Sequence, residues 1–145
     1  MKYIAAIVLM LVMSIGAACG ITDEELEEIS VELILTSEGS GIYQPSVDIN
    51  RYGVDIEYVS VADDTMGVAT DIGTVLGAYF GIIEHFNTGD LMVTVYAITG
   101  DQVATYRCEQ SWLKGKDLTN ERDLSEIAIR ALGTIETITA PRGNL

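Results

Sequence analysis

One long segment with apolar side chains at helical spacing constrains this chain's fold more than any other feature. Between Asp63 and Phe86 an apolar residue recurs every three or four positions, which is typical of an amphipathic helix. The apolar positions are Val68, Ala69, Ile72, Val75, Leu76, Tyr79, Phe80 and Ile83. A helix with such a stripe buries it against another layer, so the chain has to supply a sheet or further helices to cover it.

Strand patterns lie on both sides of this helix. Tyr52 to Val61 contains alternating apolar and acidic residues, which predicts a half-buried strand. Leu91 to Ile98 and Val103 to Glu109 are predicted to be two strands joined around Gly100-Asp101 as a hairpin. Ser37 to Ser46 contains glycines and a proline, which predicts a loop.

Two further helices are predicted near the ends of the domain. Thr22 to Thr36 begins with a capping threonine followed by acidic residues, although its final VELIL also suits a strand. Asn120 to Ile138 carries an apolar stripe, with Glu126 and Arg130 spaced as an i,i+4 ion pair. The order α-β-α-β-β-α predicts an α+β fold, with a small sheet of about three strands and helices packed on one of its faces.

The first twenty residues, MKYIAAIVLMLVMSIGAACG, have a different character from the rest of the chain. Lys2 precedes an apolar run from Tyr3 to Ile15, and small residues follow, as in a cleavable signal peptide. A membrane-spanning helix needs about 20 apolar residues, which is more than this run provides. We therefore expect residues 1–18 to be a signal peptide and residues 19–145 to form one extracytoplasmic domain.

The residues at the expected cleavage site, Gly16-Ala17-Ala18-Cys19, resemble the lipobox of prokaryotic membrane lipoproteins. The resemblance covers only the N-terminal twenty residues, and Gly16 stands where that family prefers Leu or another aliphatic residue. It implies that Cys19 becomes the lipidated first residue and holds the domain at the outer face of the cell membrane. The alternative is ordinary cleavage after Ala18 and plain secretion. Lipidation would also prevent Cys19 from pairing with Cys108, which we expect to be a small buried residue in a strand.

The charge of the chain limits its partners. With 22 acidic residues, 8 Lys and Arg and a net charge of −14, the surface repels nucleic acid and anionic lipid. It favours cations and basic partners, or is simply a solvated acidic surface. Asp63 and Asp64 are weak candidates for binding a divalent cation, and helix capping explains them equally well. No Cys/His cluster, phosphate loop or dinucleotide motif occurs in the sequence, so no cofactor is predicted.

The central helix contains three glycines spaced four residues apart, Gly73, Gly77 and Gly81. Each costs a helix roughly 1 kcal/mol relative to alanine, so some compensating contact is expected. The row lies beside the apolar stripe and forms a smooth groove that another backbone can approach closely. Packing of another element of the same chain is one interpretation, and contact with a second copy or another protein is the other.

Aromatic residues are the remaining indication of binding. They lie on or next to the predicted strands, where they either pack across strands or form a shallow surface for a sugar or peptide. They are Tyr52, Tyr58, Tyr96, Tyr106 and Trp112.

No motif for a nucleophile and its base is present, and the one histidine, His85, is expected to be exposed at the end of the central helix. The first hypothesis is therefore an anchored extracytoplasmic interaction module with an envelope protein or a second copy as its partner. The alternatives are a small exported hydrolase using paired carboxylates and a surface protein that binds divalent cations weakly.

Overall fold

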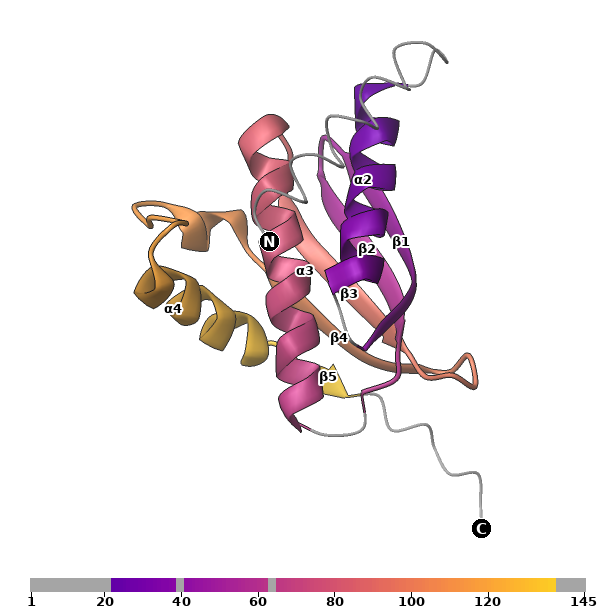
Figure 1. Cartoon of the computed structure of the whole chain (residues 1–145). Coiled ribbons are helices and arrows are strands. Elements are labelled where there is room, and N and C mark those ends of the chain that lie inside the picture. The colour runs from indigo at the N-terminus through magenta and orange to yellow at the C-terminus, as the bar shows by residue number, and fades with distance from the viewer. Residues whose placement is uncertain (1–21, 39–40, 63–64, 138–145) are drawn as a thin grey trace.

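The computed structural model describes residues 22–38, 41–62 and 65–137 (Figure 1). Their elements are α2 (Asp23–Glu38), β1 (Ile42–Asn50), β2 (Gly53–Ser60), α3 (Thr65–His85), β3 (Asp90–Tyr96), β4 (Gln102–Cys108), the 3₁₀-helix η1 (Gln110–Leu113), α4 (Glu121–Leu132) and β5 (Glu136–Thr137). The α+β class is confirmed. The predicted sheet of about three strands is wrong, because the sheet has five strands and the main order is α-β-β-α-β-β-α.

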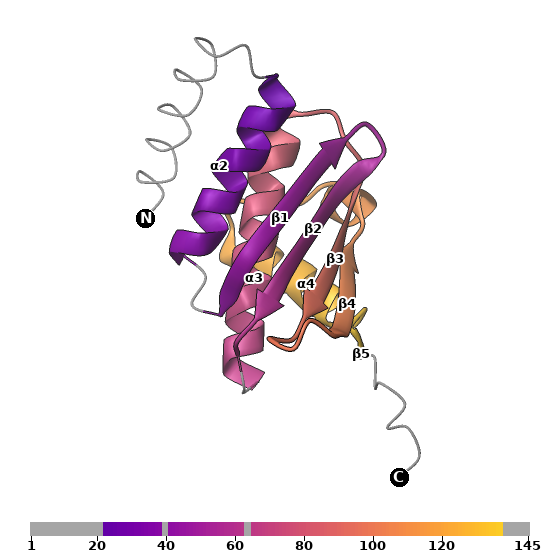
Figure 2. The same ribbon diagram turned by 90° about the vertical axis from the view of Figure 1, so that its right-hand side faces the viewer.

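The five strands form one mixed sheet in the order β1-β2-β3-β4-β5. Strands β2 and β3, which flank α3 in the sequence, are parallel, and all other neighbours are antiparallel. Figures 1 and 2 show the three helices on the same side of the sheet, with α3 between α2 and α4. The opposite face of the sheet carries no helix among the described residues (Figures 1 and 2).

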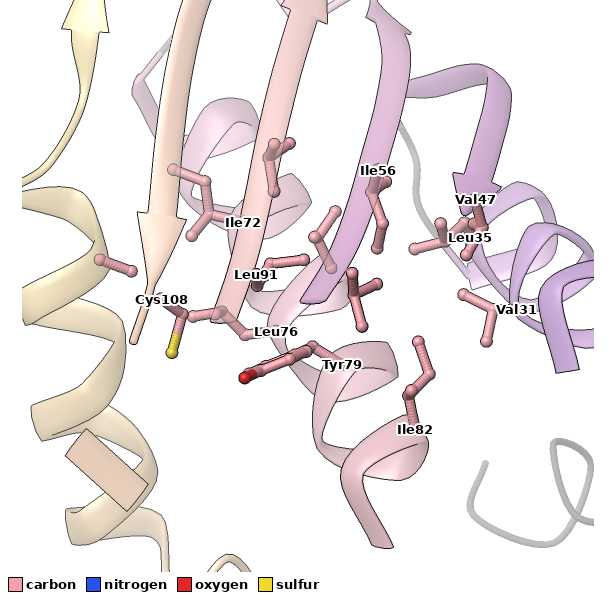
Figure 3. Close-up of a cluster of buried hydrophobic side chains, with 14 of the residues drawn as sticks. Val31, Leu35, Val47, Ile56, Ile72, Leu76, Tyr79, Ile82, Leu91 and Cys108 are labelled. Carbon is pink, nitrogen blue, oxygen red and sulfur yellow. The ribbon is translucent and has the colours of Figure 1, made fainter. Parts of the chain in front are cut away.

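The central helix and its cover follow from the sequence pattern. Apolar residues of α3 pack with alternate residues of the strands and with α2, as Figure 3 shows. Tyr79, Ile56 and Leu91 are each fully buried. The Tyr79 hydroxyl donates a hydrogen bond to the Gly89 carbonyl oxygen over 2.8 Å, so the one polar atom of this large core side chain is satisfied. From Ile72 to Phe80 the predicted apolar stripe therefore forms the centre of the core, whereas its first two residues, Val68 and Ala69, are exposed.

The predicted loop over residues 37–46 is wrong in its second half, because β1 begins at Ile42. Of the signals for a loop, Pro45 lies in an irregular part of this edge strand and Gly41 directly precedes the strand. The register of β1 shifts between Tyr43 and Ser46, and Gln44 has a φ of 48°. A proline is tolerated at such a bulge on an edge strand, because no ladder hydrogen bond is required there.

The last helix is shorter than the pattern predicted. α4 ends at Leu132 with Gly133 as its C-cap, and the short strand β5 follows, so Ile135 is not helical. The predicted pair of Glu126 with Arg130 is also not formed. Lys116 and Arg122 are the ion-pair partners of Glu126, and the Arg130 guanidinium lies 5.4 Å from the centre of the Trp112 ring. The sequence signal failed because Gly133 stops the helix before the stripe ends.

The first helix begins as predicted. The Glu25 backbone N–H donates to the Thr22 hydroxyl oxygen over 3.2 Å, and the Thr22 N–H donates to the Glu25 carboxylate over 3.4 Å. These two bonds form a capping box, which satisfies otherwise free N–H groups at the start of the helix. The capping favours α2 over the alternative strand interpretation of its last residues.

Glutamates of α2 occupy the outer edge of β1. The Ile49 N–H donates to Glu28 Oε2 over 2.8 Å, and the Val47 N–H donates to Glu32 Oε1 over 3.1 Å. These carboxylates stand where the carbonyl groups of a neighbouring strand would stand. At the other edge, Thr134 Oγ1 accepts from the Arg107 N–H over 2.9 Å. Both edges are thus partly closed to strand addition, which leaves the face of the sheet as its open surface.

We expect the double substitution Glu28→Ala and Glu32→Ala to expose the edge of β1. Two buried N–H groups would lose their acceptors, at a cost of roughly 1 kcal/mol each, and the free edge would favour association between copies. Analytical ultracentrifugation over a range of concentrations measures this. The control is Glu28→Gln with Glu32→Gln, which keeps an acceptor oxygen at each position. Equal association of both variants would show that charge, not edge capping, keeps the edge unpaired.

Candidate functional site

The helix-free face of the sheet, hereafter the open face, is defined by strand register. Residues directly opposite one another on neighbouring strands point to the same side. Because Val54, Ile56 and Tyr58 are buried beneath the helices, the residues between them belong to the open face. Its three rows are Tyr43–Val59–Tyr96, Ser46–Glu57–Thr94–Thr105 and Asp48–Asp55–Met92–Arg107.

One end of the open face is apolar and the other is acidic. The row Tyr43–Val59–Tyr96 forms the apolar end, where Tyr43 is 61% exposed, whereas Met92, which is 46% exposed, lies in the acidic row with Asp48 and Asp55. Asp48 and Asp55 stand directly opposite each other on β1 and β2, and Glu57 lies one row away. All three carboxylates are exposed, and none has an ion pair within the described part of the chain. Like charges placed directly opposite each other destabilise a sheet, so this arrangement does not serve the fold.

The five predicted binding aromatics are not brought together. Tyr96 lies on the open face, whereas Tyr52 is 76% exposed in the turn between β1 and β2, with the Arg51 guanidinium 4.7 Å from its ring centre. Trp112 is half-buried in η1.

Two of the five, Tyr58 and Tyr106, point under the helices and are buried in the core. Their hydroxyl oxygens are 3.3 Å apart and share a hydrogen bond. Desolvation by burial raises the pKa of Tyr58 to about 12, so its hydroxyl stays protonated. For these two residues, packing within the core is the interpretation that the geometry supports.

The glycine row of α3 faces outward. A Cβ atom added at Gly73, Gly77 or Gly81 would have no atom within 4 Å among the described residues. Gly73 and Gly77 are exposed, and neither α4 nor a strand covers them. The prediction that another element of the chain packs on this row therefore finds no support in the described residues. By length and composition α3 could span a membrane, but its apolar stripe already forms the core of the domain.

The groups with possible catalytic chemistry are dispersed. Cys108 is buried as predicted, and burial raises the pKa of its thiol to about 12, which keeps it in the unreactive neutral form.

A hollow of about 590 Å³ beside η1 is lined by Ile83, Asp90, Gln110, Ser111, Leu113 and Lys114. Its carboxylate, on Asp90, already accepts a hydrogen bond from the Gln110 N–H over 2.8 Å. Histidine 85 ends α3 and is exposed, as predicted.

Several predicted site residues lie outside the described residues. These are the lipidation candidate Cys19 and the cation candidates Asp63 and Asp64. Within the described ranges, no three His, Cys, Asp or Glu side chains are arranged to hold a metal ion.

Buried carboxyl groups connect the elements. Asp71 of α3 is 1% exposed and accepts hydrogen bonds from the Gly41 N–H over 3.1 Å and the Ser60 hydroxyl over 3.4 Å, which ties the start of β1 and the end of β2 to α3. A Cβ at Gly41 would lie 2.4 Å from Asp71 Oδ2, so a larger residue here would have to displace the Asp71 carboxylate. Desolvation raises the pKa of Asp71, and these two hydrogen bonds lower it in part.

Glu27 and Glu28 of α2 also have raised pKa values, mainly because burial disfavours their charged forms. The folded state therefore binds more protons than the unfolded state just above the ordinary carboxyl pKa. We expect the melting temperature to fall as the pH rises from 4.5 towards neutrality. Hydrogen bonds from Thr119 lower the pKa of Asp117. This shift makes stability rise with pH, but only near and below the ordinary pKa of an aspartate.

Thermal unfolding followed by circular dichroism across this pH range checks the prediction. Glu27→Gln removes a titrating group that is 5% exposed. The melting temperature of this variant should therefore fall less steeply with pH than that of the unmodified protein. The control is Glu24→Gln, at an exposed position of the same helix, and its melting temperature should fall with pH as steeply as that of the unmodified protein. A melting temperature that rises steadily from pH 4.5 to 7 in all three proteins would contradict the assigned direction.

The family model described as Domain of unknown function (DUF8159) matches residues 22–140. The chain belongs to this family. The match begins at Thr22, the residue that caps α2, so the DUF8159 domain includes every element described above. No curated protein and no solved structure matches the chain.

Sequence reasoning missed most of the open face of the DUF8159 domain. Tyr43 and Asp48 were not singled out because their strand was taken partly for a loop. Asp55 and Glu57 were recognised as the polar side of β2, but nothing local indicated that this side lacks a cover. Met92 gave a usable signal, because it is an apolar residue on the polar parity of β3.

Proposed function

We propose that this protein is an exported interaction module, held at the outer face of the cell membrane by lipid on Cys19, that binds another envelope protein. The observation that carries the proposal is the open face itself. Among the described residues, one whole face of the five-stranded sheet carries no helix, and this face exposes Tyr43 and Met92. Exposed apolar residues surrounded by polar ones are typical of protein interaction sites.

The arrangement of carboxylates favours binding over hydrolysis. Cleavage by paired carboxylates needs two such groups on opposite sides of a bound substrate. In the described residues, the hollow beside η1 is lined by one carboxylate, on Asp90. Asp48 and Asp55 face each other, but on the exposed surface of the sheet. A surface of this kind suits a protein partner better than a small substrate.

The location is tested on the protein isolated from its host. Intact mass should show loss of residues 1–18 together with the added mass of acyl chains, and the protein should enter the detergent phase on partitioning. Cleavage without acyl mass would indicate plain secretion. A protein that starts at Met1 and is recovered from the soluble cell interior would overturn the proposal.

The interaction is tested by photo-crosslinking in intact cells. A photoreactive residue at position 92, on the open face, should capture an envelope protein. The same residue at position 129 is the control, because Ile129 is 66% exposed on α4 and remote from the open face. Identical products from both positions would argue against the open face as the binding surface.

A further inference from the structure

Resting on the proposed interaction role, we propose that the open face binds an extended, arginine-rich segment of its partner protein. Asp48, Asp55 and Glu57 would receive the guanidinium groups, and Tyr43 and Tyr96 would stack on them. The occupant follows from three observations on this surface: carboxylates without ion pairs, the acidic character of its β1–β2 part, and tyrosine residues in the row next to Glu57.

The first observation is that these carboxylates form no ion pair among the described residues, although Asp48 accepts a hydrogen bond from the Asn50 side-chain amide over 3.2 Å. Neither ion pair in the described residues involves the open face, since both use Glu126 of α4. Arg107 is in the same row as Asp55, but Met92 of β3 lies between them. Two strand spacings, about 10 Å, separate their backbones, and their side chains form no ion pair. A cationic ligand would therefore relieve repulsion that the fold leaves in place.

The second observation is that charge is distributed unevenly along the domain. Residues 22–62, which include α2, β1 and β2, contain ten Asp and Glu but one Arg. Residues 90–132, which include β3, β4 and α4, contain seven acidic and five basic residues. Seven of the ten acidic residues lie on α2, on the other side of the sheet, and the remaining three are Asp48, Asp55 and Glu57 of the open face. The β1–β2 part of the open face is therefore acidic, which attracts a basic partner.

The third observation concerns which cation fits. Arginine can bind a carboxylate with two parallel hydrogen bonds and can also stack on an aromatic ring, whereas lysine acts as a point charge. The row Tyr43–Val59–Tyr96 lies beside the row that contains Glu57, so both kinds of contact are available to one side chain. The same stacking occurs within this chain, where the Arg51 guanidinium lies 4.7 Å from the centre of the Tyr52 ring.

A divalent metal ion is a poorer fit to this surface. Calcium needs several oxygen ligands converging at about 2.4 Å, whereas the three carboxylates are spread over two strands and two rows. No group of three metal-binding side chains is present among the described residues. Separate guanidinium groups on an extended chain match this spacing, because alternate residues of a strand repeat about every 7 Å.

The test uses the purified protein with deca-arginine, deca-lysine and calcium chloride as separate probes. Binding is measured by isothermal titration calorimetry at about 0.1 M NaCl, where exposed charges are only partly screened. Backbone amide NMR shifts locate the site. The variant is D48N/D55N/E57Q, and the control is E24Q/E84Q/E121Q, which removes the same charge from exposed helix positions. Unchanged melting temperatures show that both variants are folded.

We expect deca-arginine to bind more tightly than deca-lysine, with shifts on β1 to β3. D48N/D55N/E57Q should weaken deca-arginine binding roughly tenfold and the control less than twofold. Tyr43→Ala should remove the preference for arginine over lysine. Equal weakening by the variant and its control would overturn the inference, as would shifts confined to the helices or binding of calcium in place of the peptides. The proposed export and anchoring are judged separately, by intact mass and partitioning, and would survive these results.

Discussion

Replacing Tyr79 with alanine is expected to lower the free energy of unfolding by about 3–5 kcal/mol. Tyr79 is fully buried at the centre of the core (Figure 3). Its ring centre lies 6.2 Å from that of Phe80. Removing its ring leaves a cavity that the rigid sheet and helices cannot close. Urea unfolding followed by circular dichroism gives the change as a lower midpoint at an unchanged slope.

A matched pair of variants separates packing from hydrogen bonding at this position. Tyr79→Phe keeps the ring but leaves the Gly89 carbonyl without its donor, and should cost about 1 kcal/mol. Met66→Ala, at a position of α3 that is 76% exposed, should change stability by less than about 0.5 kcal/mol. If Tyr79→Ala lowered the free energy of unfolding no more than Met66→Ala does, the assignment of Tyr79 to the centre of the core would be wrong.

Replacing all three glycines of the α3 row with alanine is expected to raise the free energy of unfolding by about 2–3 kcal/mol. A Cβ at Gly73, Gly77 or Gly81 meets no described atom within 4 Å, so each substitution gains helix propensity without a clash. Differential scanning calorimetry measures the gain as a higher melting temperature. A destabilised triple variant would show that something covers the row.

Two other glycines provide the contrast. A Cβ at Gly89 would lie 2.1 Å from the Tyr52 carbonyl oxygen, and one at Gly53 would lie 2.5 Å from the Asp90 carbonyl oxygen. Both obstacles are backbone atoms where β2 and β3 begin side by side, so the alanine variants should be destabilised. The same chemical change is therefore expected to have opposite signs at the two sets of positions.

The triple glycine variant also distinguishes the two outward surfaces. A partner or second copy that packs on the row of α3 would be displaced by three added methyl groups, although the domain itself becomes more stable. A partner on the open face would be unaffected, because the helices and that face lie on opposite sides of the sheet (Figure 2). Crosslinking from position 92 should therefore be unchanged in the triple variant.

The sequence by itself determined the elements that depend on neighbours along the chain. The stripe of α3, the alternation of β2 and the hairpin of β3 and β4 all appear within a few residues of the predicted bounds. Thr22 and its acidic neighbours correctly marked the start of α2. These signals are local, because helix periodicity, strand parity and turn chemistry are each properties of short segments.

Only the tertiary structure decided which surfaces are covered. Strand β1 is a strand because β2 pairs with it and Glu28 and Glu32 of α2 accept hydrogen bonds from its edge, and neither contact is visible in the local sequence. Strand parity put Tyr58 on one face and Asp55 on the other, but could not say which face the helices would cover. Burial depends on contacts between residues far apart in the sequence, so the open face and the uncovered glycine row became apparent only when the helices were placed.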